Sequence, residues 1–83
     1  MRALTAGTNG EDVKRWQAFL TEQTLYRGEP HGKFDDETKQ ATVDFQRLHE
    51  LHPAEGFVTN RTLGMAMVLG FTIFDEPGKK GGE

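Results

Sequence analysis

The chain has 83 residues, with thirteen acidic and ten basic side chains and a formal net charge of -3. This length limits it to one small domain with a modest hydrophobic core. Its lysines and arginines are scattered along the chain, which argues against a nucleic-acid partner, because phosphate neutralisation needs clustered positive charge. The absence of cysteine excludes disulfides, thiolate nucleophiles and cysteine-ligated zinc sites.

The sequence shows no membrane span and no signal peptide, and its last residues are not expected to join the fold. No apolar run approaches the roughly 20 residues needed to cross a bilayer, so we expect no membrane association. Residues 1–10 lack the apolar core of a signal peptide, which predicts either a piece of a longer exported protein or another export route. Residues 76–83 are polar and rich in glycine, which is typical of a flexible tail or linker. We therefore expect one domain over residues 1–75.

Apolar side chains at helical spacing predict a first helix from about Glu11 to Glu22. Thr8 or Asn9, each followed three residues later by an acid, is expected to cap its N-terminus. The inward face of this helix consists of Val13, Trp16, Phe19 and Leu20.

A second helix is predicted from Asp35, as the capping residue, to about His49, with Pro53 preventing continuation. Its expected inward stripe is Thr38, Ala41, Phe45 and Leu48. A third helix is predicted from the capping residue Thr59 to a stop at Gly70. Its expected inner face is Thr62, Met65, Ala66 and Leu69.

The second and third helices are preceded by turns that repeat at a constant shift. The segment from His31 to Asp35 corresponds to the segment from Glu55 to Thr59. Each supplies a glycine, a hydrophobe and a capping residue before its helix, and Phe45 corresponds to Leu69. Two such units are too few for a solenoid, so we expect them to pack on the first helix. The predicted fold class is all-α, a small pseudo-symmetric three-helix bundle.

An ordered set of residues spans this pattern: Leu4, Gly7, Gly10, Asp12, Val13, Trp16, Gln17, Leu20, Tyr26, Gly28, Gly32, Phe34, Thr38, Ala41, Phe45, Gln46, Leu51, Glu55, Gly56, Val58, Thr62 and Leu63. In this order the chain resembles the peptidoglycan-binding domain family, from Leu4 to about Leu69. The resemblance implies a three-helix module that binds the cell wall without catalysis. The chain departs from the family pattern at four positions: Trp16, His31, Asp35 and Thr59.

Catalytic and metal-binding interpretations find little support in the sequence. His49 and His52 could present two imidazoles to a metal, but the glutamate of a His-Glu-x-x-His motif is missing. The acids from Asp35 to Glu37 are adjacent at a helix start, whereas glycosidic acid–base catalysis needs two carboxylates facing each other across a cleft. A helix cap and favourable dipole interactions account for them. We therefore expect no enzymatic activity, no metal and no cofactor.

Four residues are candidates for contact with a ligand: Tyr26, Arg27, His31 and Gln46. Tyr26 and Arg27 lie in a loop outside the apolar stripes, where an aromatic face could cover a sugar and a guanidinium could pair with stem-peptide carboxylates. Tyr26 could instead close the core, and His31 could be an ordinary polar turn residue. Gln46, like Gln17, could bind the stem peptide or hydrogen-bond the backbone of the connecting loops.

The leading functional hypothesis is weak, repeated binding to peptidoglycan that concentrates an attached hydrolase or other effector at the wall. It implies a monomer in the cell wall or periplasm, as part of a larger or phage-encoded protein. The alternative is a protein-interaction module of the same fold, which docks a partner through its groove or the segment from Phe71 to Phe74.

Overall fold

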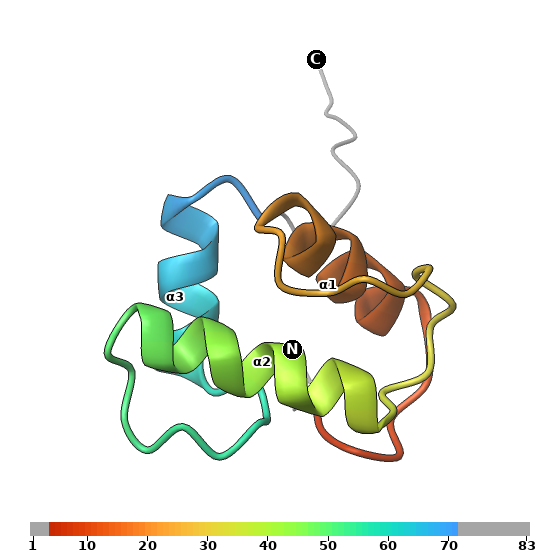
Figure 1. The fold of residues 1–83 in the computed structure, drawn as a ribbon, viewed down its shortest axis with the longest axis horizontal. Helices are drawn as coiled ribbons and strands as arrows, with labels where there is room; N and C mark the ends of the chain where they lie inside the picture. The colour runs from red at the N-terminus through yellow and green to blue at the C-terminus, as the bar shows by residue number, and fades with distance from the viewer. Residues whose placement is uncertain (1–3, 72–83) are drawn as a thin grey trace.

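The computed structural model describes residues 4–71 and contains three helices in that range (Figure 1). These are α1 (Glu11–Glu22), α2 (Asp36–Leu48) and α3 (Asn60–Val68). Within the described range the only β-type pairings are two isolated bridges, so the predicted all-α three-helix fold is confirmed. None of these helices has the length and apolar character of a membrane span.

Two of the three predicted helix caps are present. Asp35 Oδ1 accepts a hydrogen bond from the backbone N–H of Thr38 at 2.9 Å, and Thr59 Oγ1 accepts one from the backbone N–H of Thr62 at 3.2 Å. Each bond satisfies a first-turn amide that has no partner inside its helix. The sequence pattern therefore located the starts of α2 and α3 correctly.

The predicted cap of α1 was wrong. Gly10 is the residue that precedes this helix, and no side chain caps it. The N–H of Gly10 donates to the Gly32 carbonyl at 2.9 Å, and its φ of 146° is a value that side-chain-bearing residues rarely adopt. The hydroxyl of Thr8 instead accepts from the Thr5 N–H. Pairing with a distant turn, rather than a local capping box, therefore brings the chain into α1.

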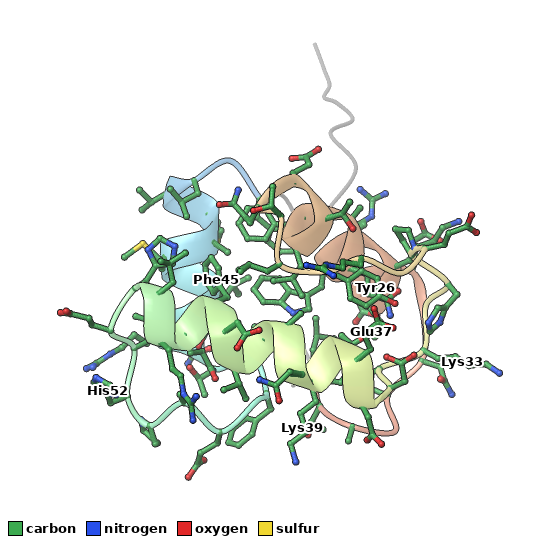
Figure 2. All side chains as sticks on the ribbon, in the orientation of Figure 1. Tyr26, Lys33, Glu37, Lys39, Phe45 and His52 are labelled. Atoms are coloured by element: carbon green, nitrogen blue, oxygen red, sulfur yellow. The ribbon has the colours of Figure 1, made fainter. Side chains whose placement is uncertain are left out.

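An aromatic cluster centred on Trp16 fills the space between the helices. The indole lies 5.6 Å from the ring of Phe45 and 5.4 Å from the ring of Phe71, in edge-to-face geometry in both cases. Its Nε1–H donates to the Thr42 hydroxyl at 2.9 Å, so the buried indole has a polar partner. In Figure 2, Phe45 points from α2 into this interior, where it has no exposed surface.

The segment before α1 crosses both turn units and joins them to the core. Val58 donates from its backbone N–H to the Leu4 carbonyl, and Phe34 donates to the Thr8 carbonyl, both at 2.9 Å. Leu4, Phe34 and Val58 are all buried. Main-chain hydrogen bonds from the segment before α1 therefore hold the two turn units together, in addition to helix packing.

Two residues assigned to the inner faces are exposed. Leu48 retains 62% of its surface and Leu69 retains 41%. On α2 the buried face also includes Thr42 and Gln46, which shifts its centre so that Leu48 lies about 90° away at 3.6 residues per turn. Leu69 follows the last residue of α3, beyond the end of the helix, so the correspondence with Phe45 fails there.

The alternative docking segment from Phe71 to Phe74 is only partly described by the structure. Phe71 is 5% exposed and packs against Trp16 and Phe19, so it belongs to the core. The other residues of the segment, like the predicted tail over 76–83, lie outside the described range. Phe71 is therefore not a surface residue available to a partner.

Replacing Phe45 with alanine is expected to lower the free energy of unfolding by about 3–5 kcal/mol, because it opens a cavity in a closely packed core. Leu48→Ala on the same helix should change it by less than about 0.5 kcal/mol, because Leu48 is mostly exposed. Urea unfolding monitored by circular dichroism measures both values. Similar losses in the two variants would contradict the observed helix face.

Candidate functional site

The first turn, residues 31–33, is held in place by the buried amide of Gln17 on α1. Gln17 Oε1 accepts the backbone N–H groups of His31 and Gly32, both at 2.9 Å. Gln17 Nε2 donates to the carbonyl of Lys33 and to the hydroxyl of Thr38, both at 2.8 Å. One side chain therefore connects α1, the turn and the first turn of α2.

Gln46 on α2 holds the second turn in the same way. Its Oε1 accepts the N–H of Gly56 at 3.0 Å, and its Nε2 donates to the carbonyl of Phe57 at 2.9 Å and to the hydroxyl of Thr62 at 3.0 Å. Only 1% of Gln46 is exposed. Of the two roles considered for Gln46, the structure contains the hydrogen bonds to the loop backbone, and the amide is not on the surface.

His31 lies at the junction of the turn, α2 and the preceding loop. Its Nδ1 accepts the N–H of Lys33 at 3.1 Å, so the neutral ring carries its hydrogen on Nε2. Nε2 lies 3.1 Å from Asp35 Oδ2 and 3.3 Å from the Tyr26 hydroxyl. The ring edge remains partly exposed. His31 is therefore oriented by its neighbours while it stays accessible to a ligand.

Two ionisable groups beside His31 have shifted pKa values. Burial acts to raise the pKa of Asp35, but hydrogen bonds from Thr38 and the interaction with His31 outweigh it, so the pKa lies below its ordinary value of 3.8. Burial raises the pKa of the Tyr26 hydroxyl above 10.0, and the nearby carboxylates of Asp35 and Glu37 reinforce this against a hydrogen bond with Thr38. At neutral pH, Asp35 is therefore an anion and Tyr26 a neutral phenol.

Of the two roles considered for Tyr26, the structure has the one in which the residue closes the core. The residue is 3% exposed, and the backbone N–H groups of Leu25 and Tyr26 donate to the Leu20 carbonyl, which folds the loop back over the end of α1. Figure 2 shows Tyr26 close to Glu37 near the start of α2. The neighbouring Arg27 is exposed. Of the loop pair, only Arg27 presents its side chain to solvent.

An open groove of about 460 Å³ lies between the start of α1 and the first turn. Its lining residues are Asn9, Gly10, Glu11, Lys14, His31, Gly32 and Lys33. Among the four candidate residues, only His31 lines this groove. The two lysines were not identified as candidates, because each lies on an expected polar surface and only the fold brings them together.

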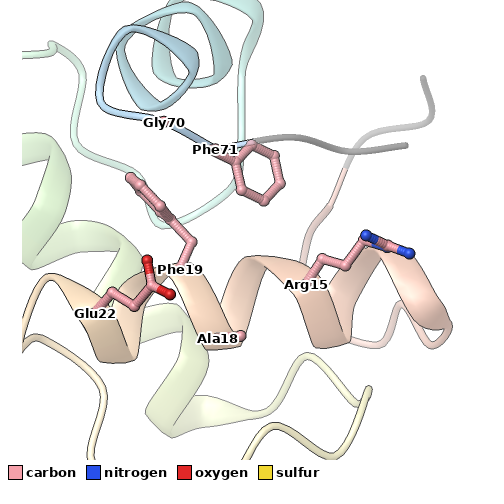
Figure 3. A pocket seen from close by; sticks show the side chains of 6 residues that line it. All are labelled: Arg15, Ala18, Phe19, Glu22, Gly70 and Phe71. Carbon is pink, nitrogen blue, oxygen red and sulfur yellow. The ribbon is translucent and has the colours of Figure 1, made fainter. Parts of the chain in front are cut away.

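A second, smaller groove of about 250 Å³ lies between α1 and the residues after α3 (Figure 3). The rings of Phe19 and Phe71, 5.3 Å apart, form its floor. Figure 3 shows Arg15 and Glu22 at opposite ends of the groove along α1. It contains none of the residues predicted to contact a ligand.

The groups needed for metal binding are not assembled in residues 4–71, where no cluster of three or more histidine, aspartate or glutamate side chains could hold an ion. His49 packs against Phe45, with ring centroids 4.6 Å apart, and His52 is exposed. Asp35 accepts hydrogen bonds from Thr38, as expected for a helix cap.

The arrangement defines a small helical binding domain with two turns clamped by buried glutamines. The chain matches the family described as "Putative peptidoglycan binding domain" over residues 9–65, which include both turns. It therefore belongs to the peptidoglycan-binding domain family, and this membership indicates association with the cell wall.

The chain was also compared with solved structures and with curated protein sequences. The crystal structure of the SleB N-terminal domain is similar, with a TM-score of 0.78 and 29% sequence identity. The similarity covers 82% of this chain and 92% of that one. No curated protein sequence gives a significant match to the chain. The structural similarity supports the three-helix fold described above.

Replacing Asp35 with alanine should lower the free energy of unfolding by about 1 kcal/mol at neutral pH, because it removes the α2 cap. Since the folded-state pKa of Asp35 is lowered, the stabilisation by its carboxylate is complete above 3.8 and is lost as the pH falls through the folded-state value. Urea unfolding from neutral pH to about pH 2 should therefore show the difference shrinking on acidification.

Asp35→Asn provides the control, because an amide oxygen can still cap the helix but cannot titrate. Its unfolding free energy should lie between those of the parent and the alanine variant at neutral pH. A constant difference between parent and alanine variant at all pH values would contradict the role given to the ionised carboxylate.

Proposed function

We propose that this domain binds peptidoglycan through the surface around its first turn and so holds an attached effector, such as a wall hydrolase, at its polymeric substrate. The family match over residues 9–65 is the observation that carries the proposal. The clamped turns and the neighbouring open groove supply a rigid surface for a ligand. The domain acts by binding alone, in the cell wall or periplasm.

Arg27 and His31 are the candidate residues that can reach a ligand directly. Arg27 is exposed in the loop before the first turn, and His31 lines the groove. Tyr26 and Gln46 contribute by positioning the turns, since both are buried. A guanidinium can form two parallel hydrogen bonds with a carboxylate, which suits the stem peptides of the polymer.

Weak affinity is compatible with this role because the polymer is repetitive. Once one module is bound, neighbouring sites remain within reach, and a tethered effector experiences a high local concentration of substrate. The domain therefore needs a rigid, accessible surface more than a deep pocket.

Sedimentation of the purified chain with insoluble peptidoglycan tests the proposal. Binding is expected to intact polymer and should be lost after an amidase removes the stem peptides. Equal sedimentation before and after amidase treatment would show that the glycan, rather than the peptide, is recognised. A chain that stays in the supernatant with intact polymer would refute the proposed function.

The chain alone is expected to release neither reducing ends nor free amino groups from purified walls. The reason is that no cluster in the described residues could hold a metal ion, and the adjacent acids from Asp35 to Glu37 are placed at the start of α2 as its cap and first turn. Assays of both products on insoluble wall material measure this. Product release that persists through repeated purification would overturn the non-catalytic assignment.

Arg27→Ala should weaken sedimentation with peptidoglycan while changing the free energy of unfolding by less than about 0.5 kcal/mol, because the side chain is exposed. Arg47→Ala, at an exposed position on α2, is the matched control for loss of one positive charge. Tyr26→Ala should instead destabilise the fold by about 3–5 kcal/mol, because it empties a buried aromatic site. Equal binding by the Arg27 and Arg47 variants would remove Arg27 from the proposed site.

A further inference from the structure

The groove beside the first turn carries local positive charge on an acidic chain. Lys14 and Lys33 line it, and Glu11 is the one acid among its lining residues. The groove thus has a formal excess of one positive charge, whereas the chain has a net charge of -3. An anionic ligand would therefore be favoured here over the average surface of the domain.

The fold fixes the approach of the two lysines. Asn9 and Lys33 form an antiparallel bridge, and the Gly10 N–H donates to Gly32. A Cβ atom added to Gly32 would lie 3.2 Å from the Gly10 carbonyl oxygen and 3.9 Å from the Lys14 Cβ, so the turn lies directly against α1. Both lysines are exposed, so a ligand can reach their side chains from solvent.

The second turn gives an internal comparison, because its clamp is built in the same way. A shift of 29 residues takes Gln17 to Gln46 and also takes Gly10 and Lys14 to Lys39 and Val43. These are the residues that a Cβ added to Gly56 would meet, with Lys39 Cγ at 2.7 Å and Val43 Cγ2 at 3.1 Å. The side chain of Lys39 therefore fills, beside the second turn, the space that Gly10 leaves open beside the first.

The two units differ in charge around the turn as well as in the space beside it. Lys14 corresponds to Val43 across the helices, and Lys33 corresponds to Phe57 across the turns. The same clamp thus forms with apolar residues at both positions. Neither lysine is required by the clamp, which makes the charged groove a particular feature of the first unit.

We propose that the groove bordered by Lys14 and Lys33 is a carboxylate subsite that takes the free carboxylates of a peptidoglycan stem peptide. This inference rests on the proposed function and adds its chemical specificity. The volume of about 460 Å³ suits the end of a short peptide, since small-molecule sites span roughly 300–1,000 Å³.

The test uses the full chain and two soluble probes, a stem tetrapeptide with free carboxylates and the same peptide with its carboxylates converted to carboxamides. Titrations followed by nuclear magnetic resonance give the dissociation constants. Lys14→Gln/Lys33→Gln removes both groove charges, and Arg47→Gln/Arg61→Gln removes two exposed charges elsewhere. Each double variant lowers the formal net charge from -3 to -5, so they are matched in overall charge.

The Lys14/Lys33 variant should bind the free-carboxylate peptide about tenfold more weakly than the parent, and the Arg47/Arg61 variant less than about twofold more weakly. The parent should prefer the free carboxylates to the carboxamides, and added salt should weaken that preference. Unchanged amide spectra of the unliganded variants, outside the substituted positions, establish that both remain folded.

Equal weakening in the two double variants would reduce the effect to overall charge and overturn the subsite. Equal affinity of the parent for both peptides would also overturn it. Sedimentation with insoluble peptidoglycan separates the two levels of inference. If the parent sediments with the polymer but binds neither peptide, the proposed function stands and the subsite is refuted. If the parent binds the free-carboxylate peptide but not the polymer, the subsite stands and the proposed wall-anchoring function is refuted.

Discussion

The buried amide of a glutamine is the interaction on which the rest of this domain depends. Gln17 has no exposed surface, and hydrogen bonds to two N–H groups, one carbonyl and one hydroxyl saturate both ends of its amide. A buried polar group left without a partner costs about 1–3 kcal/mol, so α1 and the turn that it holds cannot move independently. Without these hydrogen bonds, helix packing alone would not fix the backbone conformation of this turn.

Repetition of this clamp explains how so short a chain maintains two ordered turns. Gln46 repeats the geometry of Gln17, and α2 contributes to both units, with Thr38 near its start and Gln46 near its end. The segment before α1 pairs with both turns and completes the closure. The clamps determine where the turns lie, and the residues around each turn determine what it presents to solvent. Function can thus diverge between the units without altering their shared framework.

The sequence predicted the three helices well because helical periodicity and capping residues are local signals. Its errors came where apolar spacing alone does not decide which side chains are buried. Leu48 has the right spacing for the core, but buried Thr42 and Gln46 shift the inward face away from it. For Tyr26 the sequence left exposure and core burial open, and hydrogen bonds to the Leu20 carbonyl fold its loop over the core. A loop position alone therefore does not predict exposure.

The same reasoning explains what the sequence revealed of the site. His31 could be predicted because it occupies a recognisable turn, although its shared contacts with Tyr26 and Asp35 could not. Lys14 and Lys33 were missed because they are far apart in sequence and meet only when Gly32 packs against Gly10. Comparing the units does provide a signal, since Val43 and Phe57 stand at the equivalent positions. Once the repeat is aligned, a charged residue in one unit opposite an apolar residue in the other indicates a position not required by the fold.

The exposed position of the groove residues also determines how tightly the domain can bind a ligand. Exposed ion pairs contribute only about 0.2–1 kcal/mol each, so a groove bordered by two exposed lysines is suited to weak, reversible contact with a single carboxylate ligand. Weak contact is sufficient on a polymer that presents the same group repeatedly, because rebinding and tethering raise the effective concentration. A deeper, drier site would bind more tightly but would need buried charges, whose desolvation a core of this size could hardly offset. The rigid clamp and the open groove thus satisfy two requirements that a small wall-binding domain must meet together.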